Sequence, residues 1–135
     1  MSKTITDIEG IGVQMKKKLA KANVRSVEGL LKEGCTKKGR KAIAEATGVD
    51  EKKVLDFVNM ADLFRIKGVS TQYAELMKAA GVDTVKELRN RNPENLHEKM
   101  VETNQQKKLT RLVPSVKTIT KFVEQAKALD PVVTH

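Results

Sequence analysis

The chain repeats part of its own sequence, and this repeat limits its possible folds more than any other feature. Residues 8–31 align without gaps with residues 66–89 at an offset of 58, with 7 identical residues in 24 positions. Farther along, Phe57–Ala61 resembles Phe122–Ala126 at an offset of 65, so the second copy holds about seven extra residues, which we expect around Gln105 to Pro114. The pattern predicts a single domain, 1–135, made of two tandem units, 1–65 and 66–135.

Each unit is expected to be a run of short helices. Only 3% of the residues are aromatic and none is Trp, a composition that disfavours strands, and no segment alternates with a period of two. Residues suited to begin helices recur along the chain: Ser26, Thr36, Asp50, Thr84, Asn92 (followed by Pro93) and Ser115. Asn104 is expected to end the helix that Asn92 begins. The predicted fold class is all-α, a compact bundle of short helices.

A glycine-containing turn precedes the first amphipathic helix. Ile8-Glu9-Gly10-Ile11-Gly12 leads directly into a helix with Met15, Leu19 and Ala22 on its inner face. Glycines let a backbone turn tightly and approach a ligand, and the first amides of a helix lack helical partners. Because the helix dipole adds positive charge there, a phosphate is the natural occupant. Ile11 is expected to insert into the core and hold the turn rigid.

This turn resembles the hairpin of helix-hairpin-helix proteins, which bind DNA through backbone amides without reading its sequence. Over nearly all 135 residues, the chain also resembles a bacterial family of unknown function that carries two such hairpins. The features that carry this second resemblance are Gly10-Ile11-Gly12, Gly39-Arg40, the run from Phe57 to Leu63 before Arg65-Ile66, Tyr73-Ala74, Ala80-Gly81-Val82 and Arg91-Asn92. The resemblance implies a DNA-binding fold built from two helix-hairpin-helix units.

The second turn is the weaker candidate for a phosphate site. Gly68-Val69-Ser70 has a serine where the first turn has Gly12, and Glu75 precedes Lys78 in its helix. Both turns could also be simple helix–helix connections with no ligand.

Basic residues gather beside the first turn. Residues 14–41 hold ten Lys or Arg and two Glu, a net charge of +8 in a chain whose total is +9. Helical geometry points Lys17 and Lys21 outward and places Lys16 to one side. The candidate DNA-binding residues are therefore Gly10, Ile11, Gly12, Val13, Lys16, Lys17, Lys21, Lys37, Lys38, Arg40 and Lys41. The alternative is a solvated surface that keeps the protein soluble.

Nothing in the sequence favours an enzyme, a cofactor or a metal. His97 and His135 are the only histidines, Cys35 is the only cysteine, and no Cys/His spacing suits zinc. A lone cysteine, no signal-peptide pattern and no long apolar run predict a cytoplasmic protein that avoids membranes and is nucleoid-associated if it binds DNA.

Sequence-independent binding of duplex DNA is the function that these patterns favour. A non-enzymatic protein–protein adaptor with degenerate hairpins is the alternative from another class, and structured RNA offers the same phosphate chemistry. Tyr73 matches the inward position of Met15, so we expect it in the core rather than stacked on a base.

Overall fold

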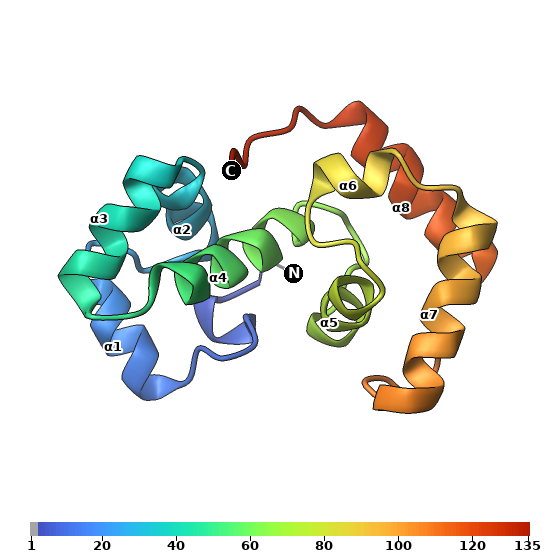
Figure 1. The fold of residues 1–135 in the computed structure, drawn as a ribbon, viewed down its shortest axis with the longest axis horizontal. Helices are drawn as coiled ribbons and strands as arrows, with labels where there is room; N and C mark the ends of the chain where they lie inside the picture. Colours follow the sequence, from blue (N-terminus) through green and yellow to red (C-terminus); the bar gives the residue numbers. More distant parts are fainter. Residues whose placement is uncertain (1–2) are drawn as a thin grey trace. The chain divides into compact units, whose positions relative to one another are not determined.

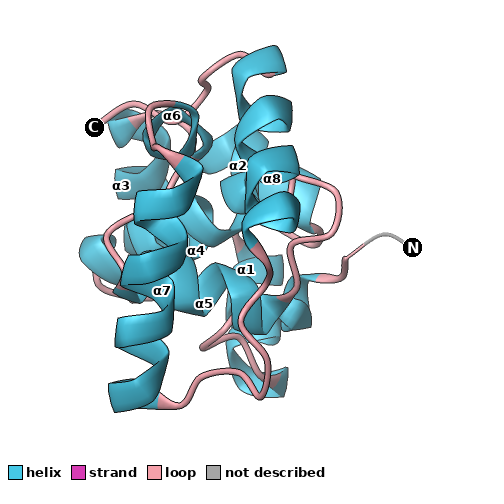
Figure 2. Cartoon of the chain, turned by 90° about the vertical axis from the view of Figure 1, so that its right-hand side faces the viewer, coloured by secondary structure: helices cyan, strands magenta, loops and turns pink. Residues whose placement is uncertain are grey.

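The computed structural model describes residues 3–135, and every regular element in this range is a helix (Figure 2). The described residues form one short 3₁₀ helix, η1, and eight α-helices. Their bounds are Ile5–Asp7 for η1, Val13–Lys21 for α1, Val27–Gly34 for α2, Lys37–Thr47 for α3, Glu51–Leu63 for α4, Thr71–Ala79 for α5, Val85–Arg89 for α6, Pro93–Lys107 for α7 and Val116–Ala128 for α8 (Figure 1). The all-α prediction is confirmed.

The contacts of the chain divide it into two compact units. Unit 1 comprises residues 1–62 together with 132–135, and unit 2 comprises residues 63–131. The division falls within three residues of the boundary expected at 65/66. That the two units together form a single domain remains a prediction.

Two pairs of helices in the two halves begin and end at corresponding positions. The bounds of α1 and α5 differ by 58 residues, and those of α4 and α8 differ by 65. Most of the length difference arises before α8: residues 108–115 join α7 to α8 whereas residues 48–50 join α3 to α4, and α7 has 15 residues whereas α3 has 11. The extra residues therefore lie where the sequence predicted them.

Most of the predicted helix starts are confirmed by side-chain caps. Oxygens of Ser26, Thr36, Thr84, Asn92 and Ser115 each accept a hydrogen bond from the backbone amide three residues ahead. Asp50 Oδ1 accepts from the amide of Lys52 at 3.2 Å. The prediction that Asn104 ends α7 is wrong, because the helix continues to Lys107 and Lys108 then adopts a left-handed conformation.

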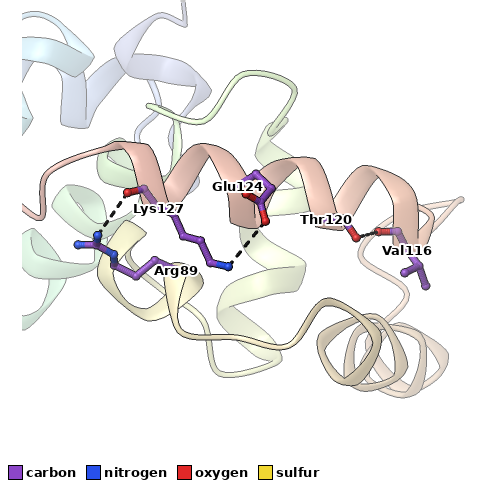
Figure 3. Close-up of polar contacts among 5 residues, drawn as sticks. All are labelled: Arg89, Val116, Thr120, Glu124 and Lys127. Atoms are coloured by element: carbon purple, nitrogen blue, oxygen red, sulfur yellow. Dashed lines mark hydrogen bonds and ion pairs between the residues drawn. The ribbon is translucent and has the colours of Figure 1, made fainter.

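Each unit has its own buried apolar side chains. In unit 1, α3 packs against α1 and α2, and Leu19, Leu30 and Ile43 are buried from these three helices. In unit 2, α8 packs against α6 and α7, and α7 also packs against α5. Figure 3 shows one polar tie within unit 2, in which Arg89 at the end of α6 donates to the carbonyl of Lys127 on α8 at 3.3 Å.

Candidate nucleic-acid interface

The backbone of the first turn reverses at Gly10. Ile8 and Ile11 are both buried, and the amide of Ile11 donates to the carbonyl of Ile8 at 3.0 Å. Gly10 has a φ of +92°, and a Cβ placed on it would lie 3.0 Å from Cε1 of Phe57. A side chain at Gly10 would therefore meet both backbone strain and the Phe57 ring. The expectation that Ile11 inserts into the core is confirmed.

Gly12 has a different environment. Its φ of −94° and ψ of −165° are extended values that any residue adopts, and no atom lies within 4 Å of a Cβ placed on it. Gly12 is the N-cap of α1 and has no side chain to accept from the first amides of the helix. The first helical bond runs from the amide of Lys16 to the carbonyl of Gly12. The start of α1 is thus open and carries the uncapped amides of Val13, Gln14 and Met15.

The second turn has the same backbone form with a closed helix start. Gly68 has a φ of +94°, and its Cβ would lie 3.2 Å from Phe122, the counterpart of Phe57. Ser70, the counterpart of Gly12, accepts a hydrogen bond from the amide of Tyr73 at 3.1 Å. The third amide of α5 is therefore satisfied within the protein, whereas the third amide of α1, that of Met15, has no such cap.

In the second turn, a side chain also holds the backbone of Lys67, the residue before Gly68. Gln125 accepts from the amide of Lys67 at 2.9 Å and donates to its carbonyl at 3.1 Å. At the corresponding place in unit 1, the amide of Glu9 faces the sulfur of Met60 at 3.3 Å. A thioether is a weak acceptor, so the first turn is held mainly by its buried isoleucines.

Most of the predicted contact residues lie on the surface of unit 1. The exposed ones lie at the first turn, on α1 and on α3, which packs on α1: Gly10, Gly12, Val13, Lys16, Lys17, Lys21, Lys37, Lys38 and Lys41. Val13 is 67% exposed, an unusual place for an apolar side chain. In unit 2, Gly68 is exposed, Ser70 is half-buried and Val69 is buried.

Arg40 is buried, unlike the other predicted basic contact residues. It is only 3% exposed, and its guanidinium donates to the carbonyls of Gly34 at 2.9 Å and Thr134 at 2.6 Å. The amide of Thr134 in turn donates to the carbonyl of Cys35 at 2.8 Å. Arg40 therefore ties residues 132–135 to the α2–α3 corner, and its charge is not presented on the exposed basic surface.

Lys53 is a basic residue at the first turn that sequence reasoning missed. A Cβ on Gly10 would lie 3.7 Å from Cε of Lys53, and the Lys53 ammonium lies 5.9 Å from the centre of the Phe57 ring. The sequence contains one signal of this position, since Lys53 precedes Phe57 by four residues, about one helical turn. However, nothing local in the sequence shows that Phe57 lies under Gly10. Glu9 is the acidic residue of the turn and is exposed.

Among residues 3–135, no three His, Cys, Asp or Glu side chains come together as metal ligands would. Cys35 is half-buried and lies 3.4 Å from the carbonyl oxygen of Lys32. Tyr73 is half-buried with its ring centre 6.4 Å from that of Phe122. None of the described helices is long and apolar enough to cross a membrane.

Comparison with known proteins gives a family without an assigned activity. The family model described as "Domain of unknown function (DUF4332)" matches residues 9–129, and the chain belongs to this family. No curated protein and no solved structure matches the chain.

Proposed function

We propose that this member of the DUF4332 family binds duplex DNA without reading its sequence, and that the first turn acts as a helix-hairpin-helix hairpin. The observation that carries the proposal is the open start of α1 at Gly12. Its amides have no side-chain cap, and the space beside Gly12 is empty. A phosphate seated there would accept hydrogen bonds from these amides and interact favourably with the helix dipole.

Neighbouring side chains suit a phosphate backbone. Lys16, Lys17 and Lys21 on α1 are exposed, and Lys53 lies beside Gly10. Such lysines add a sequence-independent attraction by releasing counterions from the DNA. Val13, exposed at the tip of the turn, offers an apolar contact to a deoxyribose ring. Backbone amides and lysines of this kind position a duplex but carry no base information.

The second turn is assigned a lesser part in this proposal. The amide of Tyr73 already donates a hydrogen bond to the Ser70 hydroxyl. Glu75 and Ala79 stand where unit 1 has Lys17 and Lys21. A phosphate at the second turn would therefore meet fewer open amides and a carboxylate in place of a lysine. We expect unit 1 to supply most of the affinity.

A salt titration tests the proposal. If about four to six phosphates are neutralised, log K for a random duplex should fall with log salt at a slope of about −4 to −5, with a Kd that is micromolar or weaker. Fluorescence anisotropy with a labelled duplex measures this slope. A flat salt response, or no binding at low salt, would contradict DNA binding and favour a protein–protein adaptor. Tighter binding to structured RNA than to DNA would redirect the proposal to RNA.

A further inference from the structure

Unit 2 holds a pocket that is lined by none of the residues assigned to the first turn. Its volume is about 610 Å³, within the range of small-molecule sites. It lies between Gln72, near the start of α5, and the end of α7 with the connection that follows. The lining residues are Gln72, Asn104, Gln105, Lys108, Leu109, Thr110 and Arg111. We infer that this pocket binds a phosphate ester of nucleotide size.

The lining favours an anion. Lys108 and Arg111 contribute two positive charges, and no carboxylate lines the pocket. The guanidinium of an arginine matches two phosphate oxygens at once, and a lysine acts as a point charge toward the same group. Gln72 and Gln105 add carboxamides that can donate to phosphate oxygens or pair with the polar edge of a base. Leu109, half-buried, supplies an apolar surface.

The wall that carries both cations is held in place by one side chain. Asn104 donates to the carbonyl of Thr110 at 2.9 Å and accepts from the amide of Thr110 at 3.1 Å. Lys108 ends α7 with a φ of +50°, which turns the chain back toward Asn104. These contacts order the connection before any ligand arrives, so binding would lose less conformational entropy there.

The segment that carries both cations is much longer in unit 2 than the corresponding segment of unit 1. Residues 48–50 join α3 to α4 directly, whereas residues 108–115 form the longer connection that carries Lys108 and Arg111. The extra residues of the second copy thus build the cationic wall. This site goes beyond the proposed function, because it uses none of the residues assigned to the first turn. A free nucleotide and a nucleotide of a nucleic-acid strand would both present the required phosphate ester.

The test is a titration of the full chain with two probes, in which the amide chemical shifts are monitored by NMR. The probes are adenosine 5′-monophosphate and a short random DNA duplex. The variant is Lys108→Asn combined with Arg111→Gln, since asparagine tolerates the left-handed backbone that Lys108 adopts. Arg111→Gln alone serves as a second variant at an exposed residue. Lys107→Gln is the matched control, because it removes a charge next to Lys108 from an exposed side chain that does not line the pocket.

We expect saturable shifts of the amides of residues 104–111. The affinity obtained from these shifts should fall about a hundredfold or more in the double variant, because two hydrogen bonds to a charged group are lost, and should be nearly unchanged in Lys107→Gln. Saturation by the mononucleotide would identify a free nucleotide as the ligand, and saturation by the duplex alone would identify a strand. No saturable shift with either probe would overturn the inference. An equal loss in Lys107→Gln would also overturn it, because a general charge effect would then suffice. Duplex binding that persists without these shifts would leave the first-turn proposal standing.

Discussion

Gly10 and Gly12 lie two residues apart in one motif but differ in backbone conformation and in surroundings. Gly10 has a φ of +92° and lies against Phe57, whereas Gly12 is extended and faces empty space. Spacing in the sequence cannot distinguish the two, because both glycines fit the same turn. The geometry assigns the conformational requirement to Gly10, whereas a side chain at Gly12 would meet neither backbone strain nor a neighbouring atom.

The substitution Gly12→Ser tests this division, because it copies Ser70 into the first turn. The serine should cap α1 by accepting from the amide of Met15, and should raise the free energy of unfolding by a few tenths of a kcal/mol. With that amide occupied, duplex affinity should fall about tenfold or more, since one hydrogen bond to a charged group contributes about 1.5 kcal/mol or more. Urea unfolding and anisotropy measure the two effects.

The reciprocal change, Ser70→Gly, is the matched control. It should lower stability by a similar few tenths of a kcal/mol and leave duplex affinity nearly unchanged. If Gly12→Ser binds DNA as well as the original chain, the turn is a structural connection and the lysines alone attract the duplex.

At the scale of helices, the sequence predicts helix starts, which depend on nearby residues, but not contacts between residues far apart in the chain. Ser26, Thr36 and Ser115 cap the predicted helices because a cap depends on residues only three positions away. Asn104 does not end α7, and its side chain instead bonds to the backbone of Thr110, a partner in the inserted connection that spacing does not reveal. Lys53 was missed for a similar reason, since only the packing of α4 brings it to Gly10.

The outward lysines of α1 give a second prediction. Lys17→Glu combined with Lys21→Glu should weaken duplex binding at least tenfold and reduce the salt slope by about 2, one for each lost phosphate contact. Helicity and Tm should hardly change, because both side chains are exposed. Circular dichroism and anisotropy at several salt concentrations measure both effects.

Its control lies on α8 of unit 2. Lys117 and Lys121 are also exposed and four residues apart on one helix. Lys117→Glu with Lys121→Glu makes the same change in net charge and should affect affinity much less. Equal losses from the two double variants would mean that both units contact the duplex.

Arg40 gives a third prediction, which separates a buried cation from exposed ones. Arg40→Met removes the donor for the carbonyls of Gly34 and Thr134 and should lower the free energy of unfolding by about 2–4 kcal/mol. The salt slope of duplex binding should not change. Lys41→Met is the control. Because Lys41 is exposed, this change should alter the free energy of unfolding by less than about 0.5 kcal/mol. If the folded Arg40→Met variant shows a shallower salt slope, Arg40 must leave the carbonyls of Gly34 and Thr134 to contact DNA.

For the molecule as a whole, the total charge of each unit does not indicate which one binds. Unit 1 has 13 basic and 9 acidic residues, a net charge of +4, and unit 2 has 13 and 8, a net charge of +5. The difference lies in placement. Residues 14–41 carry +8, so the rest of unit 1 is net acidic. A concentrated basic segment next to open helix amides attracts a phosphate backbone more strongly than the same charge spread evenly.

The distribution of aromatic side chains leads to the last prediction, a preference for duplex over single-stranded DNA. Phe57 and Phe122 are buried, Phe64 and Tyr73 are half-buried, and these four are all the aromatic residues of the chain. Without exposed rings, the protein lacks the stacking that gives single-strand binders about 1–3 kcal/mol per base. A single strand should therefore bind at least about fivefold more weakly than a duplex of equal length, since its lower charge density also releases fewer counterions. Duplexes rich in A·T and in G·C should agree within about threefold, because one bidentate base contact alone would discriminate by about 1–3 kcal/mol. Anisotropy with the three probes at one salt concentration measures both ratios. Tighter binding to the single strand, or a tenfold preference between the duplexes, would show that side chains read bases and that the turn does more than hold phosphates.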